Sequence, residues 1–416
     1  MNTKRIPVIT LALLILLSLP ARSAVSDEDF AMLKADLMAL LQRVSSLESE
    51  NHELRATTKQ VVEVVAKRSN SSSASAWADD IKWKGDFRYR YEGIRIEDQD
   101  NQDRNRIRGR IALIASLPQD VEVGFGLATG GDDPVSTNQT LGGGGSTKEV
   151  RLNLAYFNWA ATDSLNVVAG KFKNIWFRPD KNELIWDSDY NPEGFAMTYK
   201  GDKFFVNSGL NWLESDTKKG NTRFAWGIQS GFTTNIGDNI LTTGVSYYDL
   251  PVQGREVFFG EDGDFFGNSF TCVDPVDLVD CTYDNNYEEV EIFAEIKTHL
   301  GDMPVTLFGD YVQNTAVDEF DAAWAAGIKV GKASNSGTWE VAYRYQDLEA
   351  DSLFGLTVNS DFAGGGTDSK GHIFQGTYAL NKKWKLALTY FVNKRNGNQG
   401  IEEDYDRIQI DTKFKF

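Results

Sequence analysis

The chain has 416 residues, a formal net charge of −17 at pH 7 and a mean hydropathy of −0.38. This acidity argues against a nucleic-acid partner, because no basic footprint extends over the chain, and the low mean hydropathy excludes a bundle of membrane helices. The 25 Phe, 15 Tyr and 37 Gly, with only 9 Pro, favour an all-β protein.

Residues 1–24 have the pattern of a secretory signal peptide. Lys4 and Arg5 precede a short apolar run from Val8 to Leu19, and the small residues Ala21 and Ser23 follow it. The apolar run is too short for a comfortable transmembrane helix. We therefore expect an exported protein without a helical membrane anchor.

Residues 26–67 change to a helical period and predict a coiled coil. The core positions of five successive heptads are Phe30, Leu37, Val44, Asn51, Thr58 and Val65 at a, with Leu33, Leu40, Leu47, Leu54 and Val61 at d. A lone amphipathic helix packed on a domain is the alternative, but it leaves polar Asn51 and Thr58 unexplained. Residues 68–79 are Ser-rich and predict a flexible linker.

The stretch from Ile81 to Leu117 alternates with a period of two, which is the period of a β-strand. Aromatic and aliphatic residues occupy the odd positions. Basic residues occupy even positions and form an arginine ladder of Arg88, Arg90, Arg104, Arg106, Arg108 and Arg110. Arginine facing lipid near the bilayer midplane costs about 2–4 kcal/mol. The ladder must therefore line an aqueous interior if the sheet lies in a membrane. A soluble sandwich with a basic outer face is the alternative.

The alternation returns to the end of the chain and predicts sixteen strands in residues 80–416. Three are expected over Ile81–Leu117 and around Phe125 and Leu127. The others centre on 149–159, 165–173, 194–200, 204–213, 222–233, 240–249, 287–299, 305–313, 321–331, 337–347, 371–380, 384–393 and 405–416.

Connections between these strands alternate between short and long. Tight turns such as Pro118–Asp120 and Gly301–Met303 alternate with long loops such as 129–148, 174–193, 250–286 and 348–370. Such sorting is typical of an outer-membrane barrel, and an even strand count places both ends on the periplasmic side. The predicted fold class is all-β, a sixteen-stranded antiparallel transmembrane β-barrel preceded by a coiled-coil α-helix.

The chain carries few residues suited to other chemistry. Cys272 and Cys281 lie close together in a polar loop, which fits one local disulfide in an oxidising compartment better than a metal site. The three histidines are far apart and have no evident Ser or Cys partner. We therefore expect no enzyme, no cofactor and no metal site.

The barrel region resembles the trimeric sixteen-stranded bacterial porins, and in particular the putative-porin family with a coiled coil ahead of its barrel. The segments that carry this resemblance are RNRIRGRIAL (Arg104–Leu113), LATGGDDPVSTNQTLG (Leu127–Gly142), LIWDSDYNPEG (Leu184–Gly194) and the terminal Phe416. It implies a homotrimer in the outer membrane of a Gram-negative bacterium, in contact with its lipid, with the coiled coil in the periplasm.

The resemblance also implies a constriction where the third long loop folds inward. That loop is Asn174 to Glu193, and it holds Asp180, Glu183, Asp187 and Asp189. Facing it would be the arginine ladder, so that opposed charges set a transverse field across a narrow gap. The alternatives are a ladder that only pairs with neighbouring strands and a loop that is solvated outside the barrel.

Three functions remain open from the sequence. The first is passive diffusion of small hydrophilic solutes and ions through a porin. The second is a substrate-specific channel for phosphate, sugar or dicarboxylate. The third is a barrel that anchors a coiled coil tethering the outer membrane to the cell wall. The ladder favours anions and the overall acidity cations, so ion selectivity is open.

Overall fold

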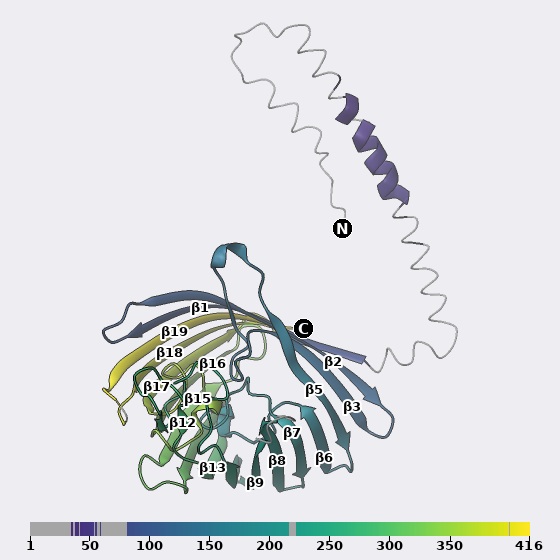
Figure 1. The fold of residues 1–416 in the computed structure, drawn as a ribbon. Helices are drawn as coiled ribbons and strands as arrows, with labels where there is room; N and C mark the ends of the chain where they lie inside the picture. Colours follow the sequence, from purple (N-terminus) through teal and green to yellow (C-terminus); the bar gives the residue numbers. More distant parts are fainter. Residues whose placement is uncertain are drawn as a thin grey trace. The chain divides into compact units, whose positions relative to one another are not determined.

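The computed structural model describes residues 35, 38–40, 42–53, 55, 59, 81–215, 222–398 and 400–416. Two compact units divide the chain, Met1–Trp77 and Ala78–Phe416, and Figure 1 shows the ribbon of each. The expected signal peptide at 1–24 and the expected linker at 68–79 lie outside the described residues.

The described part of the first unit is helical, including residues 38–40 and 42–53. Apolar side chains at the predicted heptad core positions are exposed on this helix, with Leu40 at 60%, Val44 at 50% and Leu47 at 56%. The helix agrees with the predicted period, whereas its association into a coiled coil stays a prediction. Among the described residues, no helix is long and apolar enough to cross a membrane.

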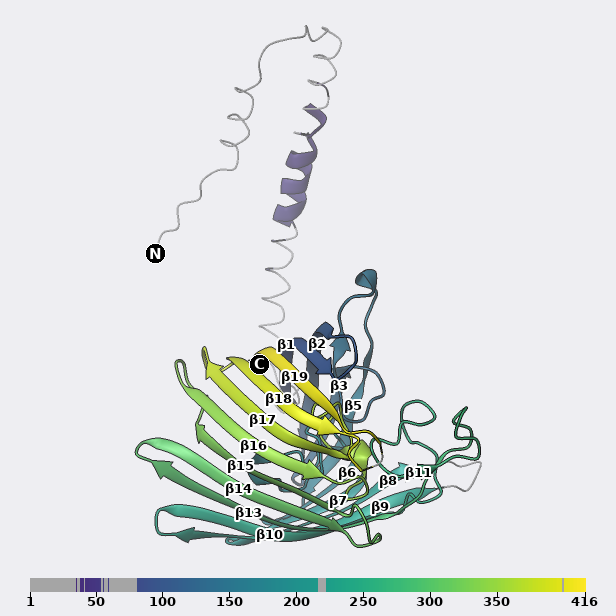
Figure 2. The ribbon, with the colours of Figure 1, turned by 90° about the vertical axis from the view of Figure 1, so that its left-hand side faces the viewer.

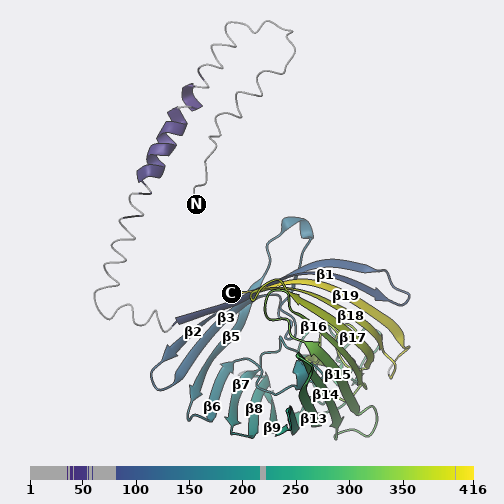
Figure 3. The same cartoon turned by 180° about the vertical axis from the view of Figure 1, so that it is seen from behind.

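The second unit is a closed antiparallel barrel of sixteen strands, because β1 pairs with both β2 and β19. Figure 3 shows β1 beside β19 from behind, with loop segments inside the curve of the strands. The barrel strands are β1 (Ile81–Ile96), β2 (Gln102–Leu117), β3 (Val121–Thr129), β5 (Val150–Ala160), β6 (Leu165–Lys171), β7 (Glu193–Lys200), β8 (Phe204–Glu214), β9 (Arg223–Ile236), β10 (Asn239–Leu250), β13 (Tyr287–Leu300), β14 (Met303–Asn314), β15 (Ala322–Gly331), β16 (Trp339–Leu348), β17 (Ser369–Ala379), β18 (Trp384–Arg395) and β19 (Glu403–Lys415).

Smaller elements lie between these strands. The loops carry the two-residue strands β4 (Gln139–Thr140), β11 (Phe270–Thr271) and β12 (Thr282–Tyr283), with the 3₁₀ turns η2 (Gly143–Gly145), η3 (Pro179–Lys181) and η4 (Gly355–Thr357). β4 extends the sheet beside β2, and β11 pairs only with β12.

The sixteen predicted strands and the fold class of the barrel are confirmed. The odd residues of β1 face outward, with Trp83 65% exposed, while Arg88 and Arg90 on the even face are buried. The same division holds on β9, where Phe224, Trp226, Ile228 and Phe232 form an exposed row. Successive side chains of a strand point to opposite faces, so a single outward aromatic row places the basic row inside.

Connections at the two ends of the barrel differ in length, as the sequence predicts (Figure 2). The turns at one end are 118–120, 161–164, 201–203, 237–238, 301–302, 332–338 and 380–383. The opposite end carries the long loops 130–149, 172–192, 251–286 and 349–368. We call the last three the β6–β7, β10–β13 and β16–β17 loops.

Three long loops pack an apolar core within the barrel. Trp186 of the β6–β7 loop belongs to one buried cluster with Phe265 of the β10–β13 loop and Phe354 of the β16–β17 loop. Inward side chains of the strands join it, among them Tyr248 and Phe308. A disulfide between Cys272 and Cys281 closes the tip of the β10–β13 loop. The packed loops fill part of the barrel interior, whereas the sequence predicts an inward position only for the β6–β7 loop.

Candidate functional site

The arginine ladder lies on the inner face of the β1–β2 hairpin. The strand register sets Arg88 opposite Arg108, Arg90 opposite Arg106 and Glu92 opposite Arg104. Directly opposed like charges repel each other. Carboxylates of β1 itself and of other elements enter between these guanidinium groups and offset the repulsion.

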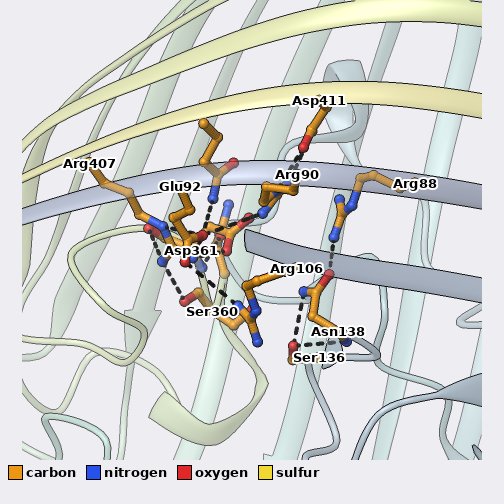
Figure 4. A network of polar contacts seen from close by, with 12 residues as sticks. Arg88, Arg90, Glu92, Arg106, Ser136, Asn138, Ser360, Asp361, Arg407 and Asp411 are labelled. Atoms are coloured by element: carbon orange, nitrogen blue, oxygen red, sulfur yellow. Dashed lines mark hydrogen bonds and ion pairs between the residues drawn. The ribbon is translucent and has the colours of Figure 1, made fainter. Parts of the chain in front are cut away.

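Glu92 and Asp361 lie between Arg90, Arg104 and Arg106 of the ladder and neutralise their charge (Figure 4). Glu92 is fully buried and accepts hydrogen bonds from Arg104 and Arg407. Arg106 lies 3.8 Å from the same carboxylate. Arg90 contacts Asp411 of β19 at 2.7 Å and Asp361 of the β16–β17 loop at 2.8 Å. These contacts join the first strand, the last strand and an inward loop.

Asp86 and Asp189 pair with Arg108 and Arg110 of the ladder. Asp86 of β1 lies 3.2 Å from Arg108 and 2.9 Å from Arg110. Asp189 of the β6–β7 loop lies 3.3 Å from Arg108 and 2.7 Å from Arg110. One acidic side chain of that loop thus reaches the ladder directly.

The other three predicted acids of the β6–β7 loop have different partners. Asp180 contacts Lys329 of β15, and its backbone N–H donates to Glu295 of β13 at 2.6 Å. Glu183 accepts a hydrogen bond from the Asn359 amide at 2.8 Å. Asp187 is buried and accepts the backbone N–H groups of Asp189 and Ser360. The loop therefore spans the interior from the ladder to β13 and β15, and Asp187 holds its shape.

Arg88 has a neutral partner instead of a carboxylate. Its Nη2 donates to the Asn138 side chain at 2.5 Å, and Ser136 in turn contacts that amide (Figure 4). Both belong to the connection between β3 and β5. Three loops thus meet the ladder, whereas the sequence predicts this for the β6–β7 loop alone.

Sequence reasoning misses the role of the β16–β17 loop. Asp361 binds Arg90 and also Arg407 of β19, the latter at 2.7 Å. Arg407 alternates with the apolar Ile408 and Ile410 on the last strand, so the period of two gives its direction. The segment around Asp361, NSDFAGGGTD, has neither alternation nor helical period, and no local pattern shows that it enters the barrel.

Opposite charges control the pKa values of the loop carboxylates. Burial alone would raise the pKa of Asp189, but Arg108 and Arg110 lower it below the ordinary value. Burial is likewise outweighed at Asp361, whose pKa Arg407 and Arg90 hold well below the usual range. Burial, with the neighbouring Glu183 and Asp189, raises the pKa of Asp187. Asp189 and Asp361 are therefore anionic at neutral pH.

A cavity of about 470 Å³ lies between the ladder, the β6–β7 loop and the β16–β17 loop. Inner faces of β16 to β19 complete its wall, through residues such as Arg344, Gln375 and Gln409. Of the predicted site residues, it is lined by Arg88, Arg90, Arg108, Arg110 and Glu183. Among the described residues, no three His, Cys, Asp or Glu side chains could hold a metal ion.

Comparisons with known proteins give one family and one fold. The family model described as a putative porin matches residues 95–257 and 270–416, whereas the search among curated proteins gave no match. OprB of Pseudomonas putida, solved at high pH, has a TM-score of 0.55 at 12% identity and covers 82% of this chain and 95% of its own. A loop L8 deletion mutant of OmpT from Vibrio cholerae has a TM-score of 0.48 at 12% identity, covering 81% and 100%. A Rhodopseudomonas blastica porin triple mutant has a TM-score of 0.47 at 13% identity, covering 81% and 100%.

Proposed function

The chain belongs to the putative porin family, and we propose that the arginine ladder and the inward β6–β7 loop form the constriction of its channel. The protein is an outer-membrane porin, a water-filled channel for passive diffusion of small hydrophilic solutes and ions. Its six ladder arginines and the loop acids Asp180, Glu183, Asp187 and Asp189 are the residues to test.

The ion pairs between Asp189 and the ladder carry this proposal. Arg108 and Arg110 come from the barrel wall, and Asp189 comes from a loop that crosses the interior. A passing solute must cross the remaining gap beside these fixed charges, and a channel selects by the width of such a gap and by its field. The ladder forms ion pairs with the neighbouring strand β19 and with two inward loops, so it stiffens the barrel wall and also faces the proposed constriction.

Planar-bilayer recording of the purified full chain tests the channel. We expect stepwise conductance in KCl, and a preparation of folded barrels that gives no steps would refute the porin function. Replacing Trp186 by Ala tests the position of the loop, because Trp186 is 3% exposed in the apolar cluster. Loosening the loop should widen the gap and raise the conductance of a single channel.

We also propose a homotrimer in which the helices of residues 26–67 form a periplasmic coiled coil. Leu40, Val44 and Leu47 support this assembly, because a row of exposed apolar side chains on one helix favours burial against another helix. Replacing Leu40 and Leu47 by Asp should reduce the helix signal in circular dichroism of the full chain. Chemical cross-linking that yields trimers equally well in that variant would place the trimer contact in the barrel alone.

A further inference from the structure

The cavity beside the ladder carries an excess of positive charge that its own structure does not neutralise. Eight basic side chains line it, against the three carboxylates of Asp86, Glu183 and Asp361. Glu92, Asp189 and Asp411 pair with lining arginines from outside the cavity, and two positive charges remain even when all three are counted. This local excess contrasts with the net charge of −17 for the chain.

Four of the lining cations have no carboxylate partner in the part of the chain that the structure describes. Among residues 81–215, 222–398 and 400–416, no carboxylate oxygen lies within the 4.0 Å limit of an ion pair from Arg88, Lys181, Arg344 or Lys415. Neighbouring cations repel one another, and the free energy of this repulsion falls when an anion enters. The cavity is thus prepared for an anionic ligand.

Backbone contacts fix Lys181 at the edge of this cavity. Asp180 and Lys181 both adopt left-handed backbone angles, with φ of 46° and 59°, a conformation that non-glycine residues rarely adopt. The Lys181 N–H donates to the Arg178 carbonyl at 2.9 Å, and the Asp180 N–H donates to Glu295. These contacts hold the turn against its backbone strain.

Neutral hydrogen-bonding groups surround the cations. Gln375, Thr389 and Gln409 line the same cavity. Guanidinium groups match the oxygen pairs of carboxylate and phosphate, and amides and hydroxyls add further hydrogen bonds to such oxygens. The volume of about 470 Å³ falls in the range of about 300–1,000 Å³ that is usual for small-molecule sites.

We propose that this cavity is a binding site for small divalent oxyanions, either phosphate or dicarboxylates, on their path through the pore. The proposal rests on the proposed channel function and adds a ligand class to it. Bound anions slow the passage of chloride, so the channel current falls saturably as the divalent anion is added.

A second cavity has the opposite charge and provides the competing expectation. It measures about 540 Å³ and is lined by the carboxylates of Asp132, Asp133, Asp189 and Glu193, against the basic side chains of Arg151 and Lys171. If this cavity controlled permeation, the channel would prefer potassium to chloride.

Bilayer recording with the purified full chain distinguishes these outcomes. In a KCl gradient we expect a reversal potential that favours chloride, and saturable block by inorganic phosphate or by succinate but not by a neutral disaccharide. A reversal potential that favours potassium, or no block by either anion, would overturn the anion site while leaving the channel intact. Absence of any conductance would instead overturn the channel function itself.

Two variants assign the block to this cavity. Lys181→Gln and Arg344→Gln together should raise the half-blocking phosphate or succinate concentration at least about tenfold, since both cations act on a divalent ligand at short range. Lys382→Gln and Lys383→Gln together, in an exposed turn at the short-turn end, remove the same two charges far from the site and should leave block unchanged. Heat-modifiable migration on gels reports folding, and Lys181→Gln alone serves if the double variant does not fold. Equal block in the folded variants would refute the assignment.

Discussion

Replacing Asp189 by Asn tests the charge balance at the ladder most directly. Asp189 is nearly buried and lies 2.7 Å from Arg110 and 3.3 Å from Arg108. Asparagine has almost the same shape, so the substitution removes one negative charge with little change in packing. Both arginines keep Asp86 as a partner, at 2.9 Å and 3.2 Å, and we expect the barrel to fold.

The expected effect is a stronger preference for anions. One unit charge about 6 Å from a permeating monovalent ion, in water, changes the free energy of that ion by about 0.7 kcal/mol. The anion and the cation shift in opposite directions, so the anion-to-cation permeability ratio should change by about 1.4 kcal/mol, or about tenfold. The reversal potential in a KCl gradient measures this ratio. The shift should shrink in 1 M salt, where the screening length falls to about 3 Å.

Asp302→Asn is the matched control for this substitution. Asp302 lies exposed in the short turn between β13 and β14, at the opposite end of the barrel from the long loops. The substitution removes one negative charge, as Asp189→Asn does. The permeability ratio of this variant should equal that of the unmodified protein. An unchanged ratio in Asp189→Asn, or a shift toward cations, would refute the assignment of Asp189 to the permeation path.

Three further predictions concern the inward loops. Asp361→Asn should weaken the attachment of the β16–β17 loop by about 1–3 kcal/mol, because Arg90 and Arg407 each lose a charged partner. Limited proteolysis should therefore cut residues 349–368 faster in this variant than in Asp318→Asn, a control in an exposed loop. Equal cutting in the two variants would contradict this role of Asp361. Lys173 follows β6 and lines a cavity with Asp86 and Arg110. Its side chain is exposed, yet partial desolvation by the surrounding protein and the charge of Arg110 lower its pKa to about 8. This lysine is therefore mainly charged below pH 8 and mainly neutral above it, so anion preference should fall between pH 7 and pH 9, and Lys173→Gln should lack that step. Reducing the Cys272–Cys281 disulfide, which spans nine positions, should destabilise the tip of the β10–β13 loop by about 2–3 kcal/mol. Proteolysis at this tip should become faster, whereas the heat-modifiable migration of the barrel should stay unchanged. Loss of the folded band on reduction would show instead that the loop supports the barrel itself.

The strands and the direction of their side chains could be predicted from the sequence because both follow from a local period. Arg88 and Trp83 are assigned to opposite faces by position alone, and the register of β1 with β2 then places the ladder inside. The partners of the ladder could not be predicted in this way. Asp361 and Arg90 are 271 positions apart, and nothing local to either residue encodes their contact.

The loops show the same limit. No local period distinguishes the four acids of the β6–β7 loop from one another, yet of the four only Asp189 forms ion pairs with the ladder. Asp180 instead meets Lys329, and Asp187 binds backbone N–H groups. The choice among them depends on the apolar packing of Trp186 and its neighbours, which sets where each acid lies.

The seam between the first and last strands has a consequence for biogenesis. Arg90 with Asp411, and Glu92 with Arg407, fasten β1 to β19 across it. In a sheet that has not yet closed, both ion pairs would be missing, although Arg90 would keep Asp361 and Glu92 would keep Arg104 as a partner. We therefore expect pairing of β19 with β1 to stabilise the closed barrel against an open sheet in the membrane, because closure forms ion pairs that the open sheet lacks.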